Sequence, residues 1–255
     1  MLSLVRRSTL AALLCSLGLT PALVSQERLA PALAGKVSGK TYFSPTGIFR
    51  VAIPVLPELG AKITDTPNVV TFQDDFNVHV SIAAFPQDAT QRWELSTRGT
   101  KDYLVYFFTN FVLADFKESF EGVELESARF MPGIMEGSLL TYITIPGGTM
   151  FEGRVPRFGA ADRLPVAKRG NMLFVLNGHI FVISTELAER VIEGGAYNRT
   201  TEEEDELLRI RLLDVVGKME FVRPPAAAGE PPSSPASTAP AQPAAPEPAG
   251  TDAGK

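Results

Sequence analysis

Residues 172–184 read MLFVLNGHIFVIS. Two apolar runs, Met172–Leu176 and Ile180–Ser184, flank the dipeptide Asn177-Gly178. Asn-Gly is the strongest short signal for a β-hairpin, because both positions tolerate a positive φ. The stretch therefore predicts two antiparallel strands joined by a tight turn, and the neighbouring sequence can be read outward from this hairpin.

Six earlier segments also have strand character, with proline, glycine or acidic turn residues between them. They are Tyr42–Phe43, Ile48–Ile53, Val69–Phe72, Val78–Phe85, Val123–Phe130 and Ser138–Ile145. Together with the hairpin they predict a mainly antiparallel sheet.

Two segments have the period of a helix. Residues 100–120 carry an unusually aromatic stripe at helical spacing: Tyr103, Leu104, Phe107, Phe108, Phe111, Val112 and Phe116. We expect this stripe to pack on the sheet; the alternative is that it lines a pocket for a hydrophobic ligand. Trp93 is expected in a loop or short turn before this helix. The closing helix begins near Thr201, whose spacing to Glu204 fits a capping box.

Hairpins with helices inserted between them predict an α+β fold, in which helices flank a mainly antiparallel sheet as an α/β/α sandwich. The layout over residues 40–223 resembles that of PsbP/DcrB-like domains. The resemblance lies in the stretch Tyr42–Pro54, the strand pair ending at Phe85-Pro86, the aromatic helix, the Asn-Gly hairpin and the closing helix that runs into Phe221. It implies a binding or assembly module, seldom a catalytic one, and carries over no ligand residue.

The chain opens with the pattern of a secretory signal peptide. Arg6 and Arg7 precede a short apolar run that Pro21 interrupts, and about 20 apolar residues are needed to span a bilayer. Cys15 does not fit a lipid-anchor signal, because bulky Leu14 precedes it. We expect residues 1–25 to be a cleaved leader, residues 26–39 a linker, residues 40–223 the globular domain and residues 224–255 a disordered Pro/Ala-rich tail.

Export would place the protein outside the cytoplasm, in the periplasm or secreted, without a stable membrane anchor. Loss of the leader removes the only cysteine, so the mature domain would have no disulfide and no thiol nucleophile. The loss also leaves 22 basic and 29 acidic residues, which changes the formal charge from −5 to 22 − 29 = −7. An acidic protein is a poor general binder of nucleic acid.

The sequence contains no catalytic, nucleotide or metal motif, so we predict no enzyme activity, no cofactor and no metal. His79 and His179 are expected to be ordinary solvent-side or edge residues. Asp74 and Asp75 are expected to serve a turn, since an EF-hand needs carboxylates spaced through twelve residues.

Residues 147–170 form the stretch most suggestive of function, because long loops are uncommon in compact domains and this one is basic in an acidic chain. Arg154, Arg157, Phe158 and Arg163 are the candidate contacts for an acidic partner, which we expect to be an envelope protein. The alternative is that part of the stretch, which ends with Lys168, Arg169 and Gly170, forms an extra strand.

The leading hypothesis is therefore an exported noncatalytic binding or assembly module of the cell envelope that uses this basic loop. The second hypothesis is an envelope enzyme or small hydrophobic-ligand carrier, with a pocket beside the aromatic helix beneath Phe107 and Phe111. The third is a structural, wall-associated protein in which the tail, residues 224–255, matters most.

Replacement of Arg154, Arg157 and Arg163 by alanine tests the first hypothesis. Capture of the envelope partner in a pull-down with crosslinking should be abolished, while the melting temperature stays nearly unchanged, because surface substitutions seldom alter stability. Undiminished capture by the triple variant would show that the loop is not the contact.

Overall fold

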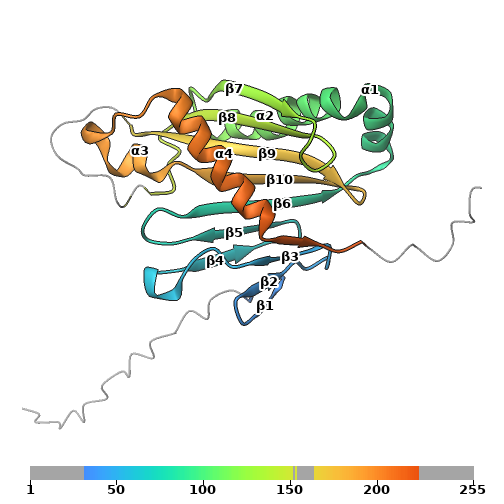
Figure 1. Ribbon diagram of the computed structural model, residues 1–255, viewed down its shortest axis with the longest axis horizontal. Coiled ribbons are helices and arrows are strands. Elements are labelled where there is room, and N and C mark those ends of the chain that lie inside the picture. The colour runs from blue at the N-terminus through green and yellow to red at the C-terminus, as the bar shows by residue number, and fades with distance from the viewer. Residues whose placement is uncertain (1–31, 152, 154–163, 224–255) are drawn as a thin grey trace, which may run out of the picture. The chain divides into compact units, whose positions relative to one another are not determined.

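The computed structural model describes residues 32–151, 153 and 164–223 (Figure 1). The chain divides into two compact units, residues 1–32 and 33–255. Apart from Ala32, every described residue belongs to the second unit. The predicted leader, the first part of the predicted linker and the predicted tail lie outside the described residues.

A seven-stranded sheet forms the centre of the domain, and every neighbouring pair in it is antiparallel. Its order is β4 (Lys62–Asp65), β5 (Val69–Gln73), β6 (His79–Pro86), β10 (His179–Glu186), β9 (Val166–Leu176), β8 (Ser138–Pro146) and β7 (Glu124–Met131). The predicted hairpin is its β9–β10 pair, with φ of 50° at Asn177 and 73° at Gly178. A second, four-stranded antiparallel sheet has the order β1 (Lys36–Ser38), β2 (Thr41–Phe43), β3 (Phe49–Ala52) and β11 (Met219–Phe221).

The aromatic segment is one long helical element with three parts: α1 (Ala89–Phe107), the π-helical segment η2 (Phe108–Val112) and α2 (Leu113–Ser119). The other helical elements are α3 (Ala188–Ile192), α4 (Thr201–Gly217) and two single 3₁₀ turns, η1 (Pro57–Leu59) and η4 (Gly194–Ala196). No helix in the described part of the chain is long and apolar enough to cross a membrane.

Two separate cores lie on opposite faces of the large sheet, because successive side chains of a strand point to opposite sides. On β9, Leu173 packs into the core beneath α1 and α2, whereas Met172 and Phe174 pack into the core shared with α4 and the small sheet. Figure 1 shows α4 crossing in front of the sheet and α1 behind it. The predicted α+β sandwich, with helices on both faces of the sheet, is therefore confirmed.

Three short strands were not predicted, and the domain begins earlier than expected. Strand β1 lies within residues 26–39, where we expected a linker. The carboxylate of Asp65 holds this segment: it accepts hydrogen bonds from the backbone N–H groups of Ala34 (2.9 Å) and Gly35 (2.7 Å) and from the Tyr42 hydroxyl (2.7 Å). Strands β1 and β11 are only three residues long, and neither has the aromatic pair and Pro/Gly turn that marked the equally short β2 in the sequence.

The helical boundaries also differ from the predictions. The aromatic helix begins eleven residues before Thr100, at a capping box of Asp88 and Gln91, so Trp93 lies in α1 and not in a loop. Gly99, with φ of 76°, interrupts the helical backbone, and this explains why the periodicity fails upstream of it. In α4 the capping box forms one residue earlier than predicted, between Thr200 and Glu203.

Candidate functional site

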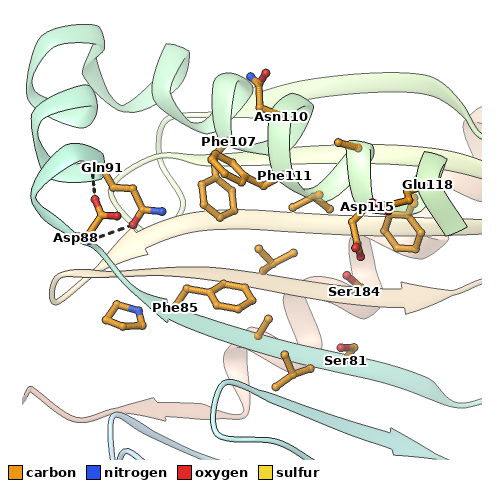
Figure 2. A pocket seen from close by; sticks show the side chains of 17 residues that line it. Ser81, Phe85, Asp88, Gln91, Phe107, Asn110, Phe111, Asp115, Glu118 and Ser184 are labelled. Carbon is orange, nitrogen blue, oxygen red and sulfur yellow. Dashed lines mark hydrogen bonds between the residues drawn. The ribbon is translucent and has the colours of Figure 1, made fainter.

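A groove of ≈760 Å³ lies between the aromatic helical element and the large sheet. Helix α1 packs mainly over β8 and β9, so it leaves part of this sheet face uncovered at β5, β6 and β10. Figure 2 shows the groove with the helix above it and the strands below. The volume falls in the range of about 300–1,000 Å³ typical of ligand pockets.

Apolar side chains line most of the groove. The floor comes from the strands: Val69, Ala83, Phe85 and Val182; the wall comes from the helical element: Phe107, Phe111, Val112, Ala114 and Phe116. The rings of Phe107 and Phe111 lie 4.9 Å apart, and Phe111 remains 46% exposed. Both phenylalanines singled out in the sequence line the groove (Figure 2), and Phe107 also belongs to the buried core, whereas Phe111 is exposed.

The π-helical segment positions this wall. The backbone N–H of Leu113 donates to the carbonyl of Phe108, which is the i to i−5 hydrogen bond of a wide helical turn. Such turns are rare and often lie at functional sites. Here the turn contains Phe108, which is buried in the core, and Asn110, Phe111 and Val112, which line the groove.

Polar groups of the groove floor belong to a row that crosses the sheet in register. Its members, on neighbouring strands, are Thr141, Asn171, Ser184, Ser81 and Thr71. The Ser184 hydroxyl donates to the Asn171 side-chain oxygen at 2.7 Å. Ser81 and Ser184 reach the groove, so its apolar floor ends in two hydroxyl groups.

The charged residues of the groove are all acidic. Asp88 lies at one end, and Asp115 and Glu118 of α2 lie toward the other, with Asp115 pointing toward Ser184 (Figure 2). Asp88 already caps α1 by accepting from the Gln91 N–H at 2.7 Å. No lysine or arginine lines the groove among the described residues. The site is therefore apolar with an acidic rim.

A buried polar layer lies next to the groove on the same face of the sheet. His79 is only 4% exposed, so the expectation that it faces solvent was wrong. Its strand is internal to the sheet, between β5 and β10. Burial, together with the nearby charge of Arg169, lowers the pKa of His79 to about 3. The imidazole is therefore neutral at pH 7 and is not among the groups that line the groove.

Glu186 holds the beginning of the long loop on this layer. Its carboxylate accepts from the Thr149 hydroxyl (2.5 Å) and the Met150 N–H (3.0 Å), and it lies 3.5 Å from Arg169. Arg169 donates to the Gly148 carbonyl at 2.9 Å and stacks over Phe116. Residues 147–151 are thus tied to the sheet.

The residues predicted to bind a partner, Arg154, Arg157, Phe158 and Arg163, lie outside the described residues. Their neighbours Lys168 and Arg169 belong to β9 and are buried, so they are not part of an exposed basic surface. Strand β9 begins at Val166. The last part of residues 147–170 therefore forms a strand, which was the alternative to a long loop.

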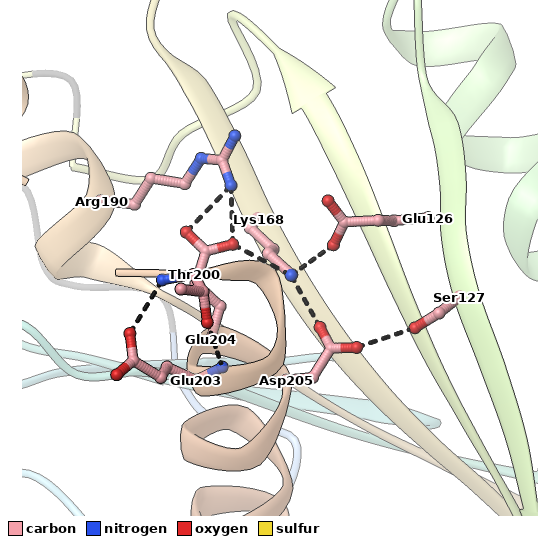
Figure 3. A network of polar contacts seen from close by, with 8 residues as sticks. All are labelled: Glu126, Ser127, Lys168, Arg190, Thr200, Glu203, Glu204 and Asp205. Atoms are coloured by element: carbon pink, nitrogen blue, oxygen red, sulfur yellow. Dashed lines mark hydrogen bonds and ion pairs between the residues drawn. The ribbon is translucent and has the colours of Figure 1, made fainter. Parts of the chain in front are cut away.

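Lys168 is the centre of a second polar cluster, on the opposite face of the sheet (Figure 3). Its ammonium group is completely buried and contacts the carboxylates of Glu126, Asp205 (2.7 Å) and Glu204 (3.0 Å); Arg190 also pairs with Glu204 at 2.8 Å. Burial by itself would lower the pKa of Lys168, but the three carboxylates outweigh it and hold this pKa above its usual value.

A lysine held so firmly in its charged form is a poor nucleophile or base. Removal of one partner from such a cluster leaves uncompensated buried charge, which is strongly destabilising. We therefore assign the Lys168 cluster a structural role: it joins β7, β9 and the first turn of α4. Glu204 and Asp205 in the acidic first turn of α4 contact Lys168 directly, while Glu203 takes part in the capping box.

The remaining candidates are also structural. Asp74 accepts the backbone N–H groups of Phe76, Asn77 and Val78, each at 2.9 Å, as expected for turn chemistry. The Nδ1 atom of His179 lies 3.0 Å from the Asn177 carbonyl in the hairpin turn. Within the described ranges, no group of three His, Cys, Asp or Glu side chains is placed to hold a metal ion.

Comparison with known proteins yields structural matches only. No protein-family model and no curated protein sequence matches the chain. The solution structure of cyanobacterial PsbP (CyanoP) from Synechocystis sp. PCC 6803 matches 75% of this chain and 99% of that chain, at 14% identity and a TM-score of 0.43. The Ran-binding protein Mog1p of Saccharomyces cerevisiae matches 74% and 96%, at 11% identity and a TM-score of 0.39.

The loose PsbP-like resemblance of layout expected from the sequence is thus supported. It transfers no ligand, partner or residue role to this chain. The groove and the polar layer beside it must be interpreted from their own geometry.

The state of His79 makes stability depend on pH. The unfolded chain binds this proton near pH 6.5, whereas the folded protein binds it only near pH 3. The free energy of unfolding should therefore fall as the pH drops from 6.5 toward 3, by up to about 1.4 kcal/mol per pH unit, and should not depend on this group above pH 6.5.

Substitution His79→Gln removes this titration. Urea unfolding followed by circular dichroism at pH 7, 6, 5 and 4 should show a shallower acid-induced loss of stability in H79Q than in the wild type. His179→Gln is the matched control, because it makes the same substitution in the hairpin turn; it keeps His79, so its acid-induced loss of stability should be steeper than that of H79Q. Parallel slopes for H79Q and the wild type would contradict the assignment.

Proposed function

We propose that this protein is an exported, noncatalytic binding module that takes up an apolar ligand or partner segment in the groove between α1–η2–α2 and the large sheet. The observation that supports this most strongly is the incomplete covering of one sheet face. Apolar strand residues there, among them the partly exposed Val69 and Phe85, form the floor of a volume of ≈760 Å³. Export is proposed from the leader pattern of residues 1–25.

The chemistry of the lining supports binding over catalysis. The hydroxyl groups of Ser81 and Ser184 have no histidine or lysine beside them among the residues that line the groove. A serine nucleophile needs an adjacent base, and Ser184 donates instead to the amide oxygen of Asn171. The lining of the groove therefore offers mainly apolar surface and a few polar groups, which favours a binding role.

A small hydrophobic molecule is the second candidate occupant. The groove beside Phe107 and Phe111 supports this alternative. Its floor joins an apolar section to the hydroxyl groups of Ser81 and Ser184, which suits a ligand with one polar end. The protein would then be a carrier, again without catalysis.

Fluorescence of the neutral dye N-phenyl-1-naphthylamine tests binding in the groove. The dye should bind the wild-type chain with enhanced emission. Replacement Phe111→Asp should weaken binding at least about tenfold, because it removes apolar surface worth about 1.5 kcal/mol and adds a charge to the wall.

Leu56→Asp provides the matched control, since Leu56 is an equally exposed apolar residue outside the groove. This variant should bind the dye as the wild type does. Absence of dye binding by the wild type, or equal loss in the two variants, would refute the proposed site. Circular dichroism establishes that both variants are folded.

A further inference from the structure

We infer that the occupant of the groove is a basic amphipathic α-helix of a partner protein. This inference rests on the function proposed above and adds the form and charge of the partner. Three features of the described residues carry it: the strand pairing beneath the groove, the width of the uncovered sheet face, and the acidic rim.

The strand pairing determines which backbone conformation can bind. Strands β5, β6 and β10 form the floor, and each is hydrogen-bonded to a neighbour on both sides. No free sheet edge is therefore available in the groove, and an extended peptide could not add to the sheet there. Backbone polar groups placed on an apolar surface must still be satisfied. A helix meets this requirement because it forms all its hydrogen bonds internally.

The width of the uncovered face fits one further helix. Three strands at about 4.8 Å spacing present a face of roughly 14 Å, and an α-helix with side chains has a diameter of about 10–12 Å. Packed helices lie about 8–10 Å apart. A partner helix beside α1–η2–α2 would cover the floor residues Val69, Ala83 and Phe85 and would contact Phe111 from the side (Figure 2).

The acidic side chains at the rim of the groove predict a positively charged partner. Asp115 and Glu118 are three residues apart on α2, and both are exposed. Neither forms an ion pair or a side-chain hydrogen bond within the described part of the chain. Some other acidic side chains of the domain are paired, such as Glu94 with Arg98 on the neighbouring α1. A helix with lysine or arginine flanking its apolar stripe would supply the missing cations, whereas an acidic helix would be repelled.

Competition with the bound dye tests this inference on the full chain. The two probes are amidated 14-residue peptides with leucine at helical spacing, one with lysine and the other with glutamate at every remaining position. The lysine peptide should displace N-phenyl-1-naphthylamine at a concentration at least about tenfold lower than the glutamate peptide, because both peptides offer the same apolar face and only their charge differs.

Charge variants separate the rim from the net charge of the protein. In the double variant Asp115→Asn and Glu118→Gln, the preference for the lysine peptide should fall about fivefold, as expected for the loss of two exposed ion pairs of about 0.5 kcal/mol each. The matched control, Glu193→Gln and Glu202→Gln, changes the net charge equally but lies outside the groove, near α3 and α4. Its preference should stay within about twofold of the wild type.

Each other outcome has a definite meaning. Equal displacement by both peptides, or an undiminished preference in the rim variant, would overturn the inferred charge while leaving the groove as a binding site. If octylamine displaces the dye and the lysine peptide does not, the occupant is a small molecule and the inference of a helical partner is wrong. If the dye does not bind the wild-type chain, the proposed binding site in the groove is refuted, and the inference about its occupant is refuted with it.

Discussion

The structure depends on one constraint: a seven-stranded sheet that is apolar on both faces must be covered on both. One face is covered by α4 together with the small sheet, and their shared core runs from Tyr42 to Met219. The other face is covered mainly over β8 and β9, by the single element α1–η2–α2. The groove is the part of that second face over which the helical layer is missing.

Strand β9 shows how the two faces are held in place. Its consecutive residues Lys168 and Arg169 point to opposite sides, and each is buried with carboxylates. Lys168 fixes the first turn of α4 on one face, and Arg169 with Glu186 fixes the start of the long loop on the other. Arg169 also lies over the ring of Phe116, which lines the groove, so this residue of β9 contributes to the site without reaching it.

Strong local patterns made much of this fold predictable from sequence. The Asn177-Gly178 hairpin, eight strands and both long helices follow from periodicity and turn residues, as does the α+β class. The short strands β1, β4 and β11 were missed. Strand β11 pairs with β3, which is far away in sequence, and the β1 segment is held by Asp65, some 30 residues away.

The candidate site was only partly predictable. The aromatic stripe marked Phe107 and Phe111, and a pocket beneath them was one of two alternatives. The sequence could not reveal that the helical layer is narrower than the sheet, nor that Val69 and Val182 both lie on the floor of one groove. Both features depend on how distant segments pack in the tertiary structure. Lys168 and Arg169 appeared to belong to a basic loop, since a buried cation cannot be distinguished from an exposed one without its carboxylate partners.

Chemical-shift mapping tests the central claim that the incompletely covered sheet face is the binding site. Backbone amide spectra of the isotope-labelled protein would be recorded during titration with the lysine peptide. The largest shifts should occur at Ser81, Ala83, Phe111 and Asp115, on both sides of the groove. Largest shifts at Glu202 and Ile210, on the α4 face, would contradict the account.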